Sequence, residues 1–268
     1  MSRAADPSAA PFTALVLAGS RPDDPVARAC GVSHKALVPA GGVPMLARVL
    51  AALQASRSVG RIAVCIEDPA VLERLPGLRA AVAAGEIAVL AAAASPSRSV
   101  LAAAGSLAAF PLLVTTADHA LLSAEMVDRF CDSARGSGAD IAVGLAPASV
   151  ILRDYPEAQR TFLRFRDDRF SGCNLFALLT PRALEAVRFW TAAERHRKRP
   201  WRLVRSFGLL ALLRFALGRM TLDEAMRRAG RAIGADAAAV RMAQAEAAID
   251  VDKPADLALV EAILRRRA

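Results

Sequence analysis

The sequence predicts an α/β fold with a central, mostly parallel sheet flanked by helices. Short apolar runs alternate with helical patterns over the first two-thirds of the chain. Polar clusters directly follow two of these runs, and parallel sheets bind their ligands beyond the carboxyl ends of the strands. The length of 268 residues and the hydrophobic content of 54% suffice for one large domain.

The expected strands are short apolar segments bounded by small or polar residues. Because helical patterns separate most of them, right-handed βαβ connections place these strands parallel. We expect strands at residues 12–17, 61–66, 87–90, 111–116 and 140–145, followed by strands on the acceptor side at 161–165 and 174–178.

The expected helices carry recognisable start signals. Pro44 suits a first helical turn, whereas Asp68 and Ser123 are suitable N-caps. Pro76-Gly77 interrupts the second helix. We expect helices at residues 44–53, 69–84, 99–109, 123–135, 181–190 and 254–267.

The domain organisation follows from a change of pattern near residue 190. We interpret residues 12–268 as one domain with a basic helical insertion at about 191–235. Thr221 and Glu224 form a capping box that starts one helix of this insertion. Residues 1–11 are small and polar, so we expect a disordered tail rather than a signal peptide.

Composition narrows the function classes. The net charge of +9 indicates an anionic partner, unless it reflects a general arginine bias. Aromatic residues make up only 5%, which argues against base stacking and a nucleic-acid partner. The four cysteines form no CxxC pair, which argues against a zinc or redox site and favours a reducing, cytoplasmic compartment.

The strongest local signal is the segment from Leu15 to Pro39, in which a strand leads into a small-residue turn. Such a turn lets backbone N–H groups approach phosphates, and Arg21 and Lys35 add positive charge beside it. The segment is neither a Walker A motif nor a dinucleotide fingerprint. An ordinary turn with surface charges remains the alternative. The candidate nucleotide-binding residues are Leu17, Ala18, Gly19 and Ser20.

Two acidic elements follow later in the chain. Asp118 ends a buried strand, where a carboxylate is costly unless it is paired or binds a metal. We expect the neighbouring His119 to be a satisfied polar side chain rather than a ligand. The segment from Asp250 to Leu257 precedes the last helix, and Asp256 suits local capping there.

These elements, in this order, resemble the nucleotidyltransferases with a glycosyltransferase-A-like fold. That family includes molybdenum-cofactor guanylyl- and cytidylyltransferases, methylerythritol-phosphate cytidylyltransferase and sugar-phosphate nucleotidyltransferases. The resemblance covers roughly residues 12–180 and 245–265 and departs from the family in a missing second loop glycine. Ala120 replaces a family proline. The matching residues are Leu17-Ala18-Gly19, Arg21, Asp118 and Lys35-Ala36-Leu37-Val38-Pro39.

The resemblance implies a Rossmann-like fold of the nucleotide-diphospho-sugar transferase type, an NTP substrate and Mg²⁺ as cofactor. It implies that Asp118 and Asp252 hold the magnesium, with Asp250 as the alternative to Asp252. It also implies that Arg21 and Lys35 are catalytic and stabilise the triphosphate and the leaving pyrophosphate.

Two further segments gain candidate roles from the same resemblance. Ser97, Arg98 and Ser99 correspond to a segment that contacts the nucleobase or ribose, although a plain helix N-cap is the alternative. Gly172 and Asn174 correspond to a glycine-containing stretch that faces the acceptor.

We therefore expect a cytoplasmic enzyme that transfers a nucleotidyl group from an NTP to a phosphorylated small molecule or lipid precursor. Residues 196–219 combine arginines with leucines, which is typical of peripheral membrane contact with a lipid-linked acceptor or of a packed subdomain. A nucleotide-sugar glycosyltransferase of the same fold and a non-catalytic membrane-associated scaffold are the competing hypotheses.

Overall fold

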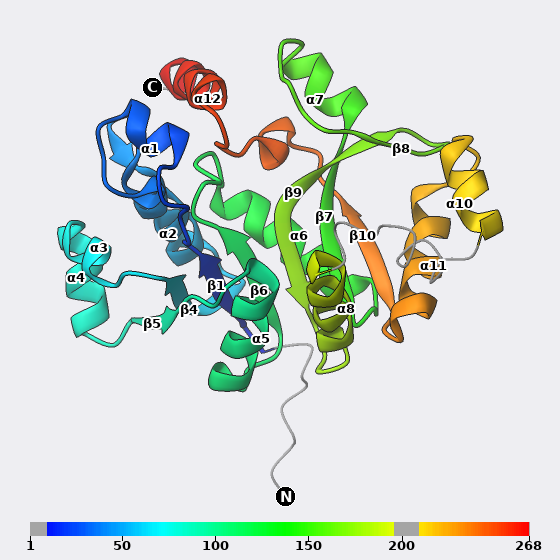
Figure 1. The fold of residues 1–268 in the computed structure, drawn as a ribbon, viewed down its shortest axis with the longest axis horizontal. Helices are drawn as coiled ribbons and strands as arrows, with labels where there is room; N and C mark the ends of the chain where they lie inside the picture. Colours follow the sequence, from blue (N-terminus) through cyan, green and yellow to red (C-terminus); the bar gives the residue numbers. More distant parts are fainter. Residues whose placement is uncertain (1–9, 196–208, 268) are drawn as a thin grey trace, which may run out of the picture.

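The computed structural model describes residues 10–195 and 209–267 (Figure 1). Within them, one eight-stranded sheet has the order β10-β7-β9-β6-β1-β4-β5, and β8 pairs with β9. A separate small hairpin is formed by β2 (Pro39–Ala40) and β3 (Val43–Pro44). The strands of the sheet are β1 (Phe12–Leu17), β4 (Val59–Ile66), β5 (Ile87–Ala91), β6 (Leu112–Thr116), β7 (Ile141–Pro147), β8 (Leu163–Arg164), β9 (Arg169–Leu178) and β10 (Ala237–Arg241).

The helices lie on both faces of this sheet and around its right-hand edge in Figure 1. Two short 3₁₀ turns, Lys35–Leu37 and Ala245–Ala248, complete the described elements. The helices are α1 (Pro25–Ala29), α2 (Met45–Ala55), α3 (Ala70–Glu73), α4 (Pro76–Ala83), α5 (Pro96–Leu107), α6 (Ala124–Gly136), α7 (Ala148–Asp154), α8 (Ala183–Arg195), α10 (Leu209–Ala216), α11 (Leu222–Ile233) and α12 (Pro254–Arg267).

Strand pairing confirms the predicted mostly parallel sheet. Strand β1 runs parallel to both β4 and β6, and the pairs β4/β5 and β7/β10 are also parallel. Strand β9 is the exception, because it lies antiparallel between β6 and β7. The chain thus turns in opposite directions from β1, which creates a topological switch point at its carboxyl end.

Alternating side chains of β1 fill two cores. Ala14 and Val16 pack with residues of α2 and α6, whereas Leu15 packs with residues of α5 and α8 on the other face. All three side chains are completely buried. Because the central strand is covered on both sides, it holds the loop after Leu17 in a fixed position.

Several boundaries differ from the expected ones. Strand β10 was not predicted, because its alanine-rich sequence has low strand propensity and it forms through pairing with β7. Helix α5 starts at Pro96, three residues early, where the Ser95 side chain accepts from the Arg98 N–H. The strand expected at residues 161–165 shrinks to β8, while β9 begins five residues before the expected start at residue 174.

The basic region after α8 is only partly described. Helices α10 and α11 lie in the described part, and Thr221 caps α11 by accepting from the Glu224 N–H at 3.2 Å. Residues 196–208, which belong to the expected insertion, and residues 1–9 of the expected tail lie outside the described residues. In the described part of the chain, no helix combines the length and apolarity needed to cross a membrane.

Candidate active site

The pairing of β1 with β6 brings the small-residue turn after β1 (residues 18–21, here called the phosphate loop) and Asp118 together. Leu17 lies opposite Thr116 in the parallel register, and the Ala117 N–H donates to the Leu17 carbonyl at 2.9 Å. Asp118 follows immediately, and its Oδ1 accepts a hydrogen bond from Thr116 Oγ1 at 2.5 Å. The predicted loop and the predicted acid therefore lie side by side at the topological switch point.

Asp252 reaches the same place through the segment that precedes α12. The Val251 N–H donates to the Asp118 carbonyl at 3.1 Å. Val251 and Ile249 are completely buried and pack with Val260 of α12. This apolar anchor fixes the segment against the loop after β6, so two acids that are far apart in sequence lie together. Asp256 caps locally as expected and accepts from the Asp252 N–H.

Lys35 connects the two acids. Its ammonium nitrogen lies 2.6 Å from Asp118 Oδ2 and 3.1 Å from Asp252 Oδ1. The side chains of Lys35 and Asp118 are 14% and 16% exposed, whereas that of Asp252 is 64% exposed. Burial alone would lower the pKa of Lys35, but the charges and hydrogen bonds of Asp118 and Asp252 outweigh it and raise that pKa. The lysine is therefore cationic at neutral pH.

The phosphate loop holds an acidic side chain that the sequence analysis missed. Glu67 Oε1 accepts from the Ser20 N–H at 3.0 Å and lies 3.0 Å from His34 Nε2. A Cβ on Gly19 would lie 3.7 Å from Glu67 Oε2. Glu67 directly follows β4. Since parallel sheets bind ligands beyond the carboxyl ends of their strands, this position could have identified Glu67 as a candidate site residue.

The remaining loop residues divide into anchored and free groups. Asp24 caps α1 by accepting from the N–H groups of Val26 and Ala27 at 3.0 Å. Arg21 is exposed, and its guanidinium has no ion pair or hydrogen bond within residues 10–195 and 209–267. Ala18 is buried and donates its N–H to the Cys65 carbonyl at 2.8 Å. The anchored groups fix the loop and leave Arg21 available to an anion.

The predicted nucleobase segment lies at the start of α5. Ser97 and Ser99 are buried and bonded inside the protein. Ser97 Oγ donates to Glu194 of α8 at 2.8 Å, and Ser99 Oγ accepts from the Ala93 N–H at 2.9 Å. Arg98 is exposed. The two serines thus join α5 to its neighbours, and of the three candidates Arg98 has the side chain open to solvent.

The predicted acceptor residues line a pocket of about 410 Å³ beside Asp252. Gly172 and Asn174 contribute to it from β9, and most other contributors are polar or charged. The full lining is Gln159, Arg160, Thr161, Leu163, Phe170, Ser171, Gly172, Asn174, Asp250, Asp252, Lys253 and Asp256. The structure therefore places the acceptor candidates and one of the predicted metal ligands around one cavity.

Asp250, the alternative to Asp252, is held on the wall of this pocket. It is bound by the Arg160 guanidinium and by Asn174 Nδ2, the latter at 2.6 Å. Burial raises the pKa of Asp250; Arg160 opposes that shift, while the nearby charges of Asp118 and Asp252 add to it. Both Asp250 and Arg160 are 13% exposed, so their ion pair is a fixed part of the wall.

A local irregularity of the sheet shapes this pocket. The register of β7 and β9 shifts between Val143 and Leu145. A Cβ on the intervening Gly144 would lie 3.1 Å from that of Leu175, closer than most real contacts. Asn174 adopts a positive φ of 49° at the same place. Strand β9 therefore bends here and carries its first half away from β6.

His119 differs from the expected satisfied side chain. It is 1% exposed, and neither ring nitrogen makes a hydrogen bond of normal geometry in the described part of the protein. Burial lowers the pKa of His119 to about 4, against the opposing charge of Asp118. The ring is therefore neutral at pH 7 and buried near the charge of Asp118.

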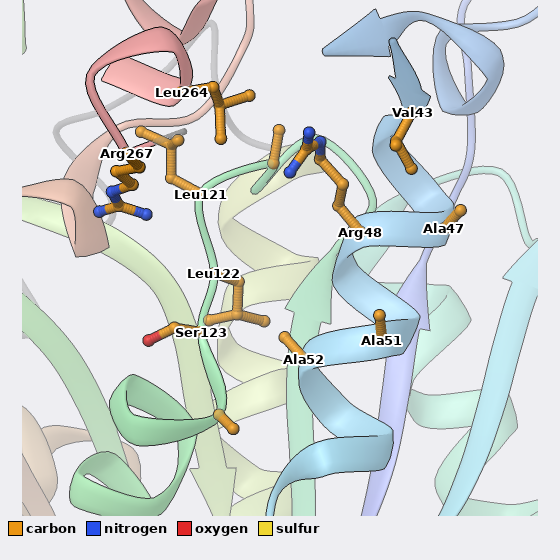
Figure 2. Close-up of a pocket in the computed structure, with 12 residues that line it drawn as sticks. Val43, Ala47, Arg48, Ala51, Ala52, Leu121, Leu122, Ser123, Leu264 and Arg267 are labelled. Carbon is orange, nitrogen blue, oxygen red and sulfur yellow. The ribbon is translucent and has the colours of Figure 1, made fainter. Parts of the chain in front are cut away.

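A second pocket of about 390 Å³ lies between α2, the loop after β6 and α12 (Figure 2). Its lining is largely alanine and leucine. The two arginines at its edge are engaged elsewhere, because Arg48 donates to the Ala40 carbonyl and Arg267 pairs with Glu246. Neither Lys35 nor Asp252 lines it. The polar pocket beside Asp252 is therefore the better match to the acidic cluster.

Comparison with solved structures supports the nucleotidyltransferase fold. A hypothetical transferase from Thermus thermophilus is 29% identical, with a TM-score of 0.77 over 92% of this chain and 100% of the other. CMP:2-keto-3-deoxy-manno-octonic acid synthetase complexed with CTP is 12% identical, with a TM-score of 0.60 over 97% and 100%. The 2-C-methyl-D-erythritol 4-phosphate cytidylyltransferase of Thermus thermophilus is 19% identical, with a TM-score of 0.53 over 94% and 98%.

Sequence comparison points to the same family. No curated protein sequence matches the chain. The model of the MobA-like NTP transferase domain matches residues 14–205, which is more than half of the chain. This match includes the phosphate loop, Lys35 and Asp118. The chain therefore belongs to the family of MobA-like NTP transferase domains and is a nucleotidyltransferase.

Proposed function

We propose that the enzyme transfers a nucleotidyl group from an NTP to a phosphorylated acceptor and releases pyrophosphate. The carrying observation is the contact of Lys35 with both Asp118 and Asp252, directly beside the phosphate loop and the polar pocket. The solved structures named above add support, since one was determined with CTP and another is a cytidylyltransferase.

Magnesium is the proposed cofactor. The described residues contain no group of three or more His, Cys, Asp or Glu side chains that could hold a metal. Protein-bound Mg²⁺ instead uses one or two carboxylates together with substrate phosphates. Asp118 and Asp252 fit this requirement, because one oxygen of each contacts the same ammonium group. When bound, magnesium would supply positive charge to the α-phosphate and the pyrophosphate.

Lys35 and Arg21 are proposed to stabilise the leaving pyrophosphate. An ammonium group has three donors, and two of those of Lys35 are used by the carboxylates. No described residue accepts from the third, which can therefore donate to a phosphate oxygen. Arg21 has no competing partner within the described residues and adds a second positive charge at the loop. Both groups oppose the negative charge that grows on the departing group.

The acceptor is proposed to bind in the pocket beside Asp252. An oxygen of its phosphate attacks the α-phosphorus, and the bond to the bridging oxygen of the pyrophosphate breaks. A phosphate oxygen is already ionised at neutral pH, so no general base is needed. Gly172, Asn174 and Arg160 line the space that the acceptor would occupy.

The proposal also covers the domain organisation. We propose that residues 12–268 form one catalytic domain, in which the insertion at 191–235 takes no part in nucleotidyl transfer. The described cysteines are all free, which supports action in the reducing environment of the cytoplasm.

A panel experiment tests the proposal. Each of the four NTPs is incubated with magnesium and a set of phosphorylated sugars, polyols and lipid phosphates, and pyrophosphate release is measured. We expect release with one NTP and one acceptor class, and its loss on chelation of magnesium. Transfer of a sugar from a nucleotide-sugar, without pyrophosphate, would instead support the glycosyltransferase hypothesis.

The glycosyltransferase hypothesis has weaker support in the site itself. Enzymes of that class normally carry two acids in a D-x-D pattern, whereas Asp118-His119-Ala120 has one. The nearest other acids at this strand end come from the segment before α12. Asp118 and Asp252 therefore suit nucleotidyl transfer better than sugar transfer.

A further inference from the structure

Strand β8 and helix α10 lie next to each other at one end of the molecule (Figure 1), and several of the side chains on β8, β9 and α10 are exposed there. Phe165 and Phe215 pack with ring centroids 5.4 Å apart, and Arg164 lies against Gly218. The members of the patch are Leu163, Arg164, Arg169, Leu213 and Leu217, all of which are exposed. We call it the β8/α10 patch.

The apolar part of the patch is unusual for this protein surface. Leu163, Leu213 and Leu217 are 51%, 55% and 56% exposed. Among the described residues, only Val43 and Trp190 join them as exposed large hydrophobic side chains. The three leucines of the patch therefore become buried only when a partner docks at this end of the molecule.

The charged part of the patch lacks acidic partners. Arg164 lies directly opposite Arg169 in the β8/β9 register, a like-charge pair that is unfavourable by itself. Neither guanidinium has an ion pair with a described residue. The acids of the intervening turn point elsewhere, since Asp167 binds Arg241 and Asp168 binds Ser149. An anionic partner would therefore relieve the repulsion between the two arginines.

The combination of arginines with exposed leucines identifies the partner. A nucleic acid would satisfy the arginines but would leave the leucines in water. Residues 196–208, which precede α10 in the sequence, carry five Lys and Arg and no acid, so this segment of the chain does not supply the missing negative charge. An anionic bilayer accepts both kinds of side chain, with leucines in the acyl boundary and arginines at the headgroups.

We propose that the β8/α10 patch docks the enzyme on an anionic lipid bilayer. The patch continues into the acceptor pocket, because Leu163 and its cross-strand neighbour Phe170 both line that pocket. A lipid-linked phosphate would enter from the membrane side and reach Asp252 at the inner end. Docking is independent of the proposed function, whereas the identity of the lipid-linked acceptor rests on it.

Vesicle flotation of the full chain tests the docking. One vesicle is pure phosphatidylcholine and the other contains phosphatidylcholine and phosphatidylglycerol at about two to one. We expect binding to the anionic vesicle alone, and weaker binding at high salt. The double variants Arg164→Gln/Arg169→Gln and Leu213→Gln/Leu217→Gln should each weaken partitioning by roughly tenfold or more.

A control removes one arginine and one large hydrophobic side chain that are exposed on other surfaces. Arg79→Gln/Trp190→Gln removes an exposed arginine on α4 and an exposed tryptophan on α8, and should change partitioning less than about twofold. Equal binding to both vesicles, or equal loss in the control, would overturn the proposal. The proposal would also be overturned if a duplex oligonucleotide displaced the protein from the vesicles and the Leu213→Gln/Leu217→Gln variant bound that oligonucleotide normally.

A second readout separates docking from nucleotidyl transfer. The thermal shift caused by the NTP that the panel identifies, together with magnesium, should be unchanged in both patch variants. Lys35→Ala should lose pyrophosphate release yet float with the anionic vesicles. An active Lys35→Ala enzyme that still floats would refute the proposed function and leave docking standing. A variant without leucines that still floats would refute docking alone.

Discussion

Two carboxylate clusters lie side by side in this enzyme and differ in how their cations are held. In one, the flexible Lys35 bridges Asp118 and the well-exposed Asp252. In the other, Arg160 and Asn174 bind Asp250, and both members of the ion pair are 13% exposed. The first cluster lies beside the loop after β1, while the second forms part of the wall of the polar pocket beside Asp252.

This difference indicates that the first cluster can rearrange around a substrate, whereas the second stabilises the fold. An ammonium on a flexible stem, next to an exposed carboxylate, can rearrange around an incoming triphosphate and metal at low cost. A buried guanidinium–carboxylate pair loses much more when either member is removed. We therefore expect substitutions in the first cluster to change catalysis, and substitutions in the second to change stability.

The largest effect is expected at Lys35. Lys35→Ala and Asp118→Ala should each lower kcat by roughly a hundredfold or more, because charge stabilisation of the transition state is lost. Circular dichroism should show the same fold. Asp132→Ala serves as the control, since this acid pairs with Arg57 on the surface. Full activity of Lys35→Ala would remove the basis of the assigned site.

The second prediction compares Asp250 with Asp252. Asp250→Ala should lower the free energy of unfolding by about 2–3 kcal/mol, because it leaves Arg160 unpaired in a partly buried site. Asp252→Ala should lower it by less than about 0.5 kcal/mol, because its carboxylate is mostly exposed. Urea denaturation of both variants measures the difference. Equal losses would show that the two clusters do not differ as described.

The third prediction concerns the backbone at Asn174. Alanine and glycine at this position both lose the hydrogen bond to Asp250, but only alanine is strained at the positive φ of 49°. Asn174→Ala should therefore be about 1 kcal/mol less stable than Asn174→Gly in denaturant titrations. If the two variants unfold at the same urea concentration, the backbone at this bend is not left-handed in solution.

The smallest effect is expected at Glu67. Its carboxylate accepts the hydrogen bond of the Ser20 N–H, which is then not free for a phosphate, and it adds negative charge where a triphosphate is proposed to bind. Glu67→Ala should lower KM for the NTP by roughly two- to fivefold with little change in kcat. The exposed acid Glu73, on α3, provides the control Glu73→Ala. An increased KM in Glu67→Ala would show that this carboxylate supports the loop instead of competing for it.

Much of this architecture could be predicted because local patterns and strand-end rules act together. The strand before Ala18 and the position of Asp118 follow from apolar runs and their ends. The meeting of Asp118 with Asp252 follows from the order of motifs in related enzymes. The contact of Lys35 with both acids could not be predicted, because it depends on side-chain directions in three separate segments.

Other features depend on partners that sequence patterns do not specify. Ser97 is tied to Thr191 and Glu194, which lie almost a hundred positions further along the chain. Strand β10 consists largely of alanines and forms because β7 offers a free edge. Asp250 was an alternative metal ligand, and its engagement by Arg160 became visible only when the chain was folded.

The bend in β9 at Asn174, beside Gly144 of β7, makes the width of the polar pocket beside Asp252 a local property. Strand β9 is paired with β6 at Phe176 and separates from it toward Gly172. The end of β9 near Phe176 is therefore fixed by β6, whereas the position of the end near Gly172, which lines the pocket, depends on the bend. Moving that bend by a residue or two would change the size of the polar pocket, where the acceptor is proposed to bind. It would leave the loop after β1 unchanged. A change of acceptor can thus evolve on this fold while the residues proposed to bind the triphosphate stay the same.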